Sequence, residues 1–280
     1  MLVKGVSTIT KKLIALDLDG TTLNNDGQIS ARTKATLNQA IKAGCVVSLV
    51  TGRPNRISEN FYDELHLNSP MINFNGNLGI LPHQNWPREY QYTIDKEIVM
   101  ELLGKKKQLG LSLIAVEGRD LFLANKGIKS GFGFFPSTLK TNQILSQKSL
   151  QDNPISITVE VKPELKAGLI DFVEKQFGDQ VEVSPWGGPH PIVEIATKGV
   201  HKSTGLKFLA DYYGILQQDI IAFGDEDNDR TMMSYAGKSV AMKNAIPSIK
   251  ALANDVTTYT NEEDGVARYL QAHLDLAVSQ

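Results

Sequence analysis

The chain has 280 residues and a net charge of −2, with 41% apolar and 21% charged residues. This composition is ordinary for a globular protein, and the length predicts two domains or one domain with a large insertion. Without a long run of Lys or Arg, the sequence excludes attraction of the whole molecule to nucleic acid or anionic lipid. The lone cysteine excludes an intramolecular disulfide, and we find no apolar stretch of signal-peptide or membrane-spanning length, so we expect a cytoplasmic protein.

An apolar run at residues 13–16 is followed directly by acidic residues. Four consecutive apolar residues predict a short strand that is buried on both faces. Asp17 and Asp19 lie two positions apart and would share one face of an extended backbone, after which Gly20 turns the chain. Ligand sites in open α/β sheets lie at the carboxyl ends of strands. This stretch therefore indicates either a metal-dependent acid pair or an Asp-rich turn that caps the next element.

The following segments alternate between helix and strand. Ser30 is suited to cap a helix that ends at Gly44, and residues 45–50 predict a second buried strand. A helix that begins at Pro54 and a strand at residues 71–74 complete the pattern, which predicts a parallel sheet with right-handed crossovers. The second and third strands both end on polar residues, namely Thr51, Gly52 and Arg53, and Asn75, Gly76 and Asn77.

From about residue 83 the pattern changes to a doubled β-α-β-β order. The predicted elements are strand 90–94, helix 95–110, strands 111–116 and 121–124, and then strand 155–161, helix 163–178 and strands 181–184 and 192–196. Residues 125–153 connect the two halves, and their sequence predicts no structure. The turn at residues 186–190 is either an ordinary turn or a specificity loop that reaches over the site.

The first pattern returns from residue 197 onward. A helix at 202–213 and a strand at 220–223 precede an acidic cluster at 225–229, and a helix, a strand and two helical segments complete the chain. We therefore expect an α/β fold with a doubly wound, Rossmann-like parallel-sheet core and an inserted α/β domain. The core is expected to comprise residues 1–82 and 197–280, and the insertion residues 83–196.

Three of the predicted strands end on Asp-x-Asp, Thr-Gly-Arg and Gly-Asp-x-x-Asn-Asp, and in a parallel sheet these endings lie at one edge. The negative charge of so many carboxylates would be costly without a metal, and oxygen ligands favour Mg²⁺ over zinc. A hydroxyl at Thr51 and an ammonium at Lys202 would suit the oxygens of a phosphoryl group. The carboxylates expected at this edge are Asp17, Asp19, Asp225 and Asp229.

The segments DLDGT, VTGR, FNGN, GVHKSTGLKFL and AFGDEDNDRTM, in this order, resemble the haloacid dehalogenase superfamily. The chain is most similar to the Cof-type phosphatases, whose α/β cap is inserted between the second and third motifs. This resemblance implies a Mg²⁺-dependent phosphatase that hydrolyses a small phosphate monoester, such as a sugar phosphate, through an aspartyl-phosphate. The alternatives are a phosphomutase and a non-catalytic regulator that binds a phosphorylated metabolite. A monomer and a small homo-oligomer both remain open.

The resemblance also assigns roles to single residues. Asp17 would be the nucleophile and Asp19 the general acid and base, although the ordinary pKa of an aspartate is about 3.9. The metal would be held by Asp17, the main-chain carbonyl of Asp19, Asp225 and Asp229. Thr51 and Asn75 could instead cap helices, and Lys202 could be a solvated lysine. The residues expected to bind phosphate or substrate are Thr51, Gly52, Arg53, Asn75, Lys202 and Asn228.

Overall fold

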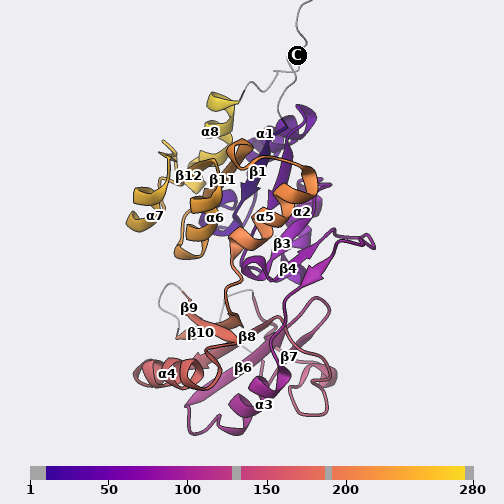
Figure 1. The fold of residues 1–280 in the computed structure, drawn as a ribbon, viewed down its shortest axis with the longest axis vertical. Helices are drawn as coiled ribbons and strands as arrows, with labels where there is room; N and C mark the ends of the chain where they lie inside the picture. The colour runs from indigo at the N-terminus through magenta and orange to yellow at the C-terminus, as the bar shows by residue number, and fades with distance from the viewer. Residues whose placement is uncertain (1–10, 128–133, 187–190, 275–280) are drawn as a thin grey trace, which may run out of the picture.

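The computed structural model describes residues 11–127, 134–186 and 191–274. These residues form two five-stranded sheets and one three-stranded sheet. In Figure 1 the first five-stranded sheet and its helices lie in the upper part of the molecule, and the second lies below them. Within the described ranges, we find no helix with the length and apolar character that crossing a bilayer requires.

The first sheet is parallel, as predicted, and has the order β13-β12-β11-β1-β2. Its central strand β1 pairs with β11 on one side and β2 on the other, and all four residues of β1 are buried because helices cover both faces of the sheet. The strands are β1 (Leu13–Leu16), β2 (Val46–Leu49), β11 (Ile220–Gly224), β12 (Lys238–Ala241) and β13 (Asp255–Val256).

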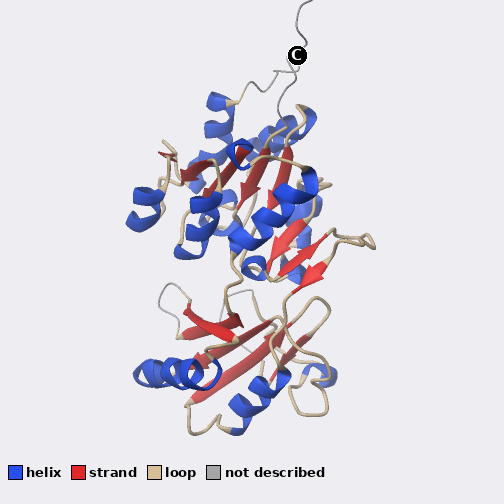
Figure 2. Cartoon of the chain, viewed as in Figure 1, coloured by secondary structure: helices blue, strands red, loops and turns tan. Residues whose placement is uncertain are grey.

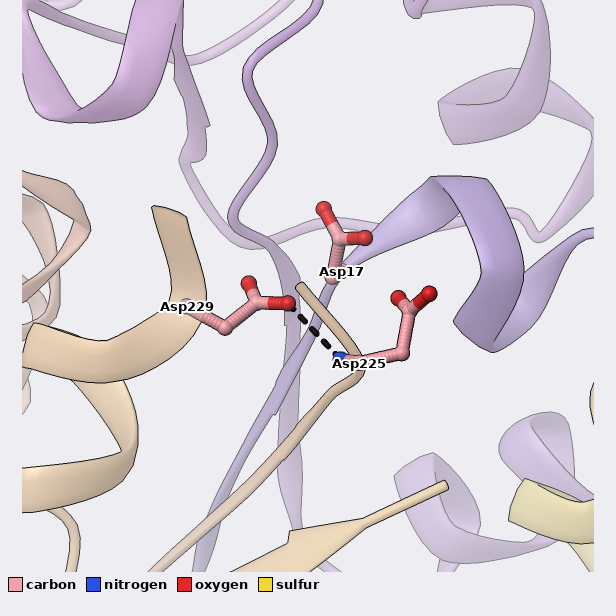
Figure 3. A group of neighbouring side chains, drawn as sticks. All are labelled: Asp17, Asp225 and Asp229. Carbon is pink, nitrogen blue, oxygen red and sulfur yellow. Dashed lines mark hydrogen bonds between the residues drawn. The ribbon is translucent and has the colours of Figure 1, made fainter. Parts of the chain in front are cut away.

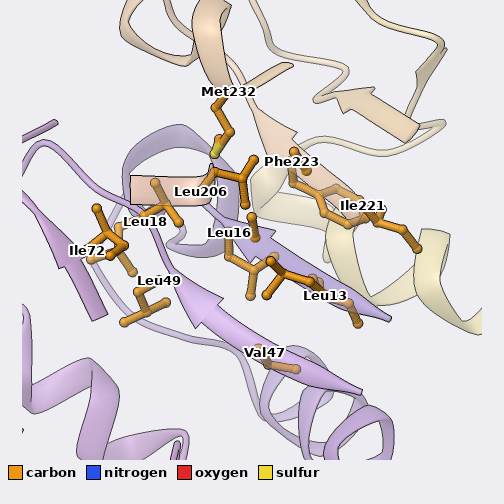
Figure 4. Close-up of a cluster of buried hydrophobic side chains, with 14 of the residues drawn as sticks. Leu13, Leu16, Leu18, Val47, Leu49, Ile72, Leu206, Ile221, Phe223 and Met232 are labelled. Carbon is orange, nitrogen blue, oxygen red and sulfur yellow. The ribbon is translucent and has the colours of Figure 1, made fainter. Parts of the chain in front are cut away.

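Helix α1 of this part begins after Ser30, whose hydroxyl accepts the Thr33 N–H and so caps the helix as predicted. Helix α1 packs against α8, and α5 packs against α6. Figure 4 shows the apolar side chains between the helices and the sheet, with Leu16 and Phe223 near the centre. The helices are α1 (Ala31–Lys42), α2 (Glu59–Glu64), α5 (Lys202–Tyr213), α6 (Arg230–Tyr235), α7 (Pro247–Leu252) and α8 (Gly265–His273).

A small antiparallel sheet of β3 (Met71–Asn73), β4 (Leu78–Ile80) and β5 (Tyr90–Gln91) continues the first sheet beyond β2. Strand β3 is joined to the parallel sheet by the parallel bridge between Val50 and Ile72. The predicted place of strand 90–94 in the inserted layer is wrong, because β5 pairs with β4. The Tyr90 ring lies against Gly79, where an added Cβ would be 2.3 Å from Tyr90 Cε1.

The second five-stranded sheet is antiparallel and has the order β7-β6-β8-β10-β9. Helices α3 (Lys96–Gly104) and α4 (Lys166–Phe177) pack on one face and form a separate apolar cluster with it. Figure 2 shows these two helices on the side of the sheet that faces away from the first sheet. The strands are β6 (Leu111–Glu117), β7 (Phe122–Ala124), β8 (Ser156–Val161), β9 (Val181–Pro185) and β10 (Ile192–Thr197).

The structure differs from one prediction for this part and does not describe the segment of another. The predicted helix 95–110 is too long, because α3 ends at Gly104 and residues 105–110 form turns before β6. Residues 187–190 of the predicted turn lie outside the described residues. The division of the chain at residues 83 and 197 remains our proposal.

Candidate active site

Three buried aspartates meet at the carboxyl ends of two neighbouring strands. Asp17 follows β1 and Asp225 follows β11, and these strands pair in parallel, with Leu16 opposite Phe223. One carboxylate oxygen from each of Asp17, Asp225 and Asp229 lies within 4.8 Å of the others. The three residues are only 5%, 8% and 0% exposed, respectively. Figure 3 shows their carboxylates grouped around the ends of the two strands.

Lys202, the first residue of α5, is the cation of this cluster. Its Nζ donates hydrogen bonds to Asp17 Oδ1 and Asp229 Oδ1, both at 2.6 Å. Burial alone would lower the pKa of the Lys202 ammonium, but the charges and hydrogen bonds of the two carboxylates outweigh burial and raise it. The side chain is fully buried, so the alternative of a solvated lysine is wrong.

The cluster retains excess negative charge, since one ammonium faces three carboxylates. Burial and the neighbouring charge of Asp229 raise the pKa of Asp225 to about 7. Burial also raises the pKa of Asp17, whereas the charge of Lys202 acts in the opposite direction. A buried group of oxygen ligands with uncompensated charge is the environment that suits Mg²⁺. The residues present therefore fit the expected metal.

The turn after β1 holds Asp225 in place. Gly20 has a φ of +68°, and a Cβ at this position would lie 2.1 Å from Asp225 Oδ2. Thr21 Oγ1 donates to Asp225 Oδ1 at 2.9 Å, and Asn244 Nδ2 donates to the Gly20 carbonyl at 2.7 Å. Sequence reasoning missed Thr21 and Asn244. The position of Thr21 directly after DLDG was an available signal, whereas nothing local marks Asn244.

Asp229 differs from the other two carboxylates because its oxygens already accept several hydrogen bonds. Its Oδ2 accepts the backbone N–H groups of Asp225 at 2.8 Å and Glu226 at 3.1 Å, while its Oδ1 accepts Lys202. Asp229 therefore positions both Lys202 and the loop that carries Asp225.

Asp19 lies apart from the buried cluster. Its side chain is 54% exposed and accepts two hydrogen bonds from Arg53, from Nε at 2.7 Å and from Nη2 at 2.5 Å. The Arg53 guanidinium lies between two rings, 5.3 Å from the centre of Phe61 and 5.0 Å from the centre of Phe134. The structure thus brings the predicted residues Asp19 and Arg53 together as a two-point ion pair whose Asp19 side is exposed.

The remaining predicted residues contact Arg53 or one another. Thr51 is buried, and its Oγ1 accepts the Arg53 N–H at 3.1 Å, so part of its role is in the local turn. Asn228 Nδ2 donates to Asn75 Oδ1 at 3.1 Å, and a Cβ at Gly52 would lie 3.0 Å from the same oxygen. Asn75 has a φ of +54°, and its side chain does not cap its helical turn.

Asn75 also reaches the second sheet. Its Nδ2 donates to Oε2 of Glu194 in β10 at 3.3 Å. Sequence reasoning missed Glu194. The available signal was a single glutamate within the otherwise apolar run Ile192, Val193 and Ile195, which a buried strand would not contain without a reason.

The chain matches the family model described as haloacid dehalogenase-like hydrolase over residues 14–270. Among characterised proteins, it is 33% identical to the 5-amino-6-(5-phospho-D-ribitylamino)uracil phosphatase YitU of Bacillus subtilis, over 94% of this chain and 98% of that protein. It is 29% identical to the pyridoxal phosphate phosphatase YbhA of Escherichia coli, over 95% of this chain and 100% of that protein.

Solved structures have the same fold. A haloacid dehalogenase-like hydrolase from Bacteroides thetaiotaomicron superposes with a TM-score of 0.81 at 25% identity, over 94% of this chain and 99% of that chain. These matches extend over both five-stranded sheets of the present structure.

Proposed function

Because the chain belongs to the haloacid dehalogenase-like hydrolase family, we propose that it is a Mg²⁺-dependent phosphatase acting on a small phosphate monoester. The observation that carries this proposal is the buried group of three aspartates with Lys202 at the ends of β1 and β11. Such a group combines a nucleophile with the positive charge that a phosphoryl group requires.

The proposed metal ligands are the carboxylates of Asp17 and Asp225 together with the main-chain carbonyl of Asp19. Asp229 would contribute mainly by holding Lys202 and the Asp225 loop, in line with the hydrogen bonds it accepts. When bound, Mg²⁺ supplies positive charge that offsets the carboxylates and the phosphoryl oxygens. Lys202 and Thr51 would hold the phosphoryl oxygens, and Asn228 would orient them.

The reaction would proceed in two steps. An oxygen of Asp17 attacks phosphorus while the ester P–O bond breaks, and Asp19 gives its proton to the departing oxygen. Asp19 then takes a proton from a water molecule as the oxygen of that water attacks phosphorus. This second step releases phosphate, restores the Asp17 carboxylate and returns the proton to Asp19.

The ion pair with Arg53 bears on the role of Asp19. The Arg53 guanidinium occupies both carboxylate oxygens of Asp19. In our proposal, Arg53 turns away from Asp19 when substrate binds, so that an oxygen of Asp19 can meet the departing oxygen of the substrate.

The names of the relatives suggest which compounds to test. One acts on a phosphorylated ribitylaminouracil and another on pyridoxal phosphate, so the present chain is expected to take a phosphate ester of a small metabolite. The experiment measures phosphate release from these two compounds, ribose 5-phosphate, glucose 6-phosphate and p-nitrophenyl phosphate, with Mg²⁺ and with a chelator. Wild type is compared with Asp17→Asn and with Asp63→Asn, which changes an exposed aspartate outside the site.

We expect release that requires Mg²⁺, that is lost in Asp17→Asn and that is retained in Asp63→Asn. Undiminished release by Asp17→Asn, with contaminating phosphatases excluded, would contradict the proposed mechanism. Phosphate binding without release from any compound would instead favour the non-catalytic regulator.

A further inference from the structure

The second sheet has two different faces. Along its strands, alternate residues pack against α3 and α4, and these residues are apolar: Ile114, Val116, Ile157, Val159, Val193 and Ile195. The residues between them line the other face. In register across that face stand Glu194, Thr158 and Ala115, and beside them Ala196, Ser156 and Glu117. This part of the second face, called the polar face below, carries two glutamates, a serine and a threonine, which a surface needed only for packing would not carry, whereas Leu113 and Ala124 on the same side of the sheet belong to an apolar cluster.

Two contacts join the polar face to the first part of the molecule. Glu194 accepts a hydrogen bond from Asn75, and Glu117 accepts one from Arg56 Nε at 2.7 Å. Both donors lie in single 3₁₀ turns, which follow β2 and β3 beside the candidate active site. The polar face is therefore turned toward that site, opposite the aspartate cluster.

The two glutamates of this face have different hydrogen-bond partners. Glu117 pairs with Arg56, whereas the donors to Glu194 within the described part of the chain are neutral, namely Ser156 Oγ at 3.1 Å and Asn75 Nδ2 at 3.3 Å. Among the described residues, no cationic side chain forms an ion pair with Glu194. Burial raises the pKa of Glu194 to about 7, and the charges of Glu117 and Glu182 contribute to the rise. Because burying a carboxylate without a cationic partner costs free energy, Glu194 is a candidate for a functional residue.

Asn75 places Glu194 close to the phosphoryl group of the proposed reaction. Its amide nitrogen binds Glu194, and its amide oxygen binds Asn228, which directly precedes Asp229. Glu194 thus lies two hydrogen bonds from Asn228. A substrate whose phosphorus lies at Asp17 would extend its leaving group from the aspartate cluster toward this carboxylate.

Aromatic rings cover the neighbouring part of the same face. Trp186, which follows β9, lies 5.5 Å from Phe134 and 6.1 Å from Phe135, measured between ring centres. These rings pack with Ala115 and Ala124 on the same side of the sheet. An acceptor beside a ring surface suits a leaving group that has hydroxyl groups on its edge and C–H groups on its face.

We propose that Glu194 is a specificity-determining residue whose carboxylate accepts hydrogen bonds from hydroxyl groups of the leaving group. This inference rests on the proposed phosphatase function. Glu194 thereby selects a sugar or polyol phosphate over an ester whose leaving group has no hydroxyl. Ser156 and Asn75 orient the carboxylate, and each leaves lone pairs of Glu194 available for the substrate.

The test compares two substrates in four proteins. The value of kcat/KM is measured for ribose 5-phosphate and for p-nitrophenyl phosphate, with wild type, Glu194→Ala, Glu194→Gln and Glu160→Gln. Glu160 is a partly exposed glutamate of β8 and serves as the matched control. Because hydrogen bonds to a charged group are strong, we expect kcat/KM for ribose 5-phosphate to fall about 10- to 100-fold in Glu194→Ala. For p-nitrophenyl phosphate we expect a change of less than about threefold.

Glutamine has nearly the shape of glutamate, so Glu194→Gln is expected to fold normally. It should lose part of the preference for ribose 5-phosphate over p-nitrophenyl phosphate. Equal losses for both substrates would overturn the inference, because Glu194 would then act on the structure of the site. Unchanged values for both substrates would overturn it as well.

A binding measurement separates this inference from the proposed function. If wild type releases phosphate from neither ester, the proposed function fails, and calorimetry on Asp17→Asn then decides the role of Glu194. When Glu194→Ala is added to Asp17→Asn, the affinity for ribose 5-phosphate relative to inorganic phosphate should fall by the same factor as kcat/KM, about 10- to 100-fold. A ratio that Glu194→Ala leaves unchanged would refute the inference.

Discussion

Replacement of Lys202 with methionine tests the electrostatic account of the site. Methionine keeps most of the apolar stem but removes the ammonium that bridges Asp17 and Asp229. The loss of one partner from a fully buried ion pair typically costs about 3–5 kcal/mol, because a charge remains buried without compensation. For a protein of this size, such a loss corresponds to a decrease in melting temperature of roughly 10 °C.

The pH dependence of this loss has a definite sign. Without the ammonium, the pKa of Asp17 in the folded state rises further above its value in the unfolded chain. The folded variant then binds more protons than the unfolded chain at intermediate pH, so its stability falls as pH rises. The destabilisation should therefore be larger at pH 8 than at pH 5.5.

The assay is denaturant unfolding at both pH values, with chelator and with Mg²⁺. Lys207→Met is the matched control, because Lys207 lies on the same helix with an exposed side chain and should change stability by less than about 0.5 kcal/mol. Mg²⁺ should stabilise Lys202→Met more than wild type, since it replaces part of the lost positive charge. A loss below about 1 kcal/mol, or an equal loss at both pH values, would refute the reasoning.

Two further predictions concern the turn after β1. Gly20→Ala should weaken Mg²⁺ binding and destabilise the fold by at least about 1 kcal/mol more than Gly27→Ala, because both glycines have a positive φ but only Gly20 touches Asp225. Unfolding and calorimetry would show this, and equal losses would contradict it. Asp19→Asn should reduce phosphate release at least about 100-fold and change the Mg²⁺ affinity less than about twofold, because the proposed metal contact is a main-chain carbonyl. A large loss of affinity in calorimetry would contradict that contact.

The parallel core was predictable because its signals are local. The apolar run of β1 ends on Asp17, and the run of β11 ends on Asp225, so sequence alone placed both at one edge of one sheet. The family motifs then identified Lys202, whose complete burial no local pattern could reveal. Its burial depends on α5 packing across the sheet, which is a property of the assembled fold.

The parts that were not predicted depend on distant contacts. Where β5 pairs with β4, the Tyr90 ring lies on Gly79, and neither residue indicates this contact without the other. The partner of Asp19 is a side chain 34 positions away. Glu194 meets Asn75 across 119 positions, so its place opposite the aspartate cluster could be found only once the two sheets were arranged in space.

The adjacency of β1 and β11 has a consequence for how the protein is made. Thr21 and Asp225, which come from the two ends of the chain, are 204 positions apart. During synthesis, the first strands emerge long before the strand that must lie beside β1, so β1 has an open edge until the last third of the chain arrives. Closing such a long loop costs little more than closing a short one, and the second sheet can shorten it by folding first. A nascent chain that stalls before β11 therefore contains Asp17 and Lys202 but lacks Asp225 and Asp229, and the buried group of carboxylates is completed only when β11 and the loop after it have been made.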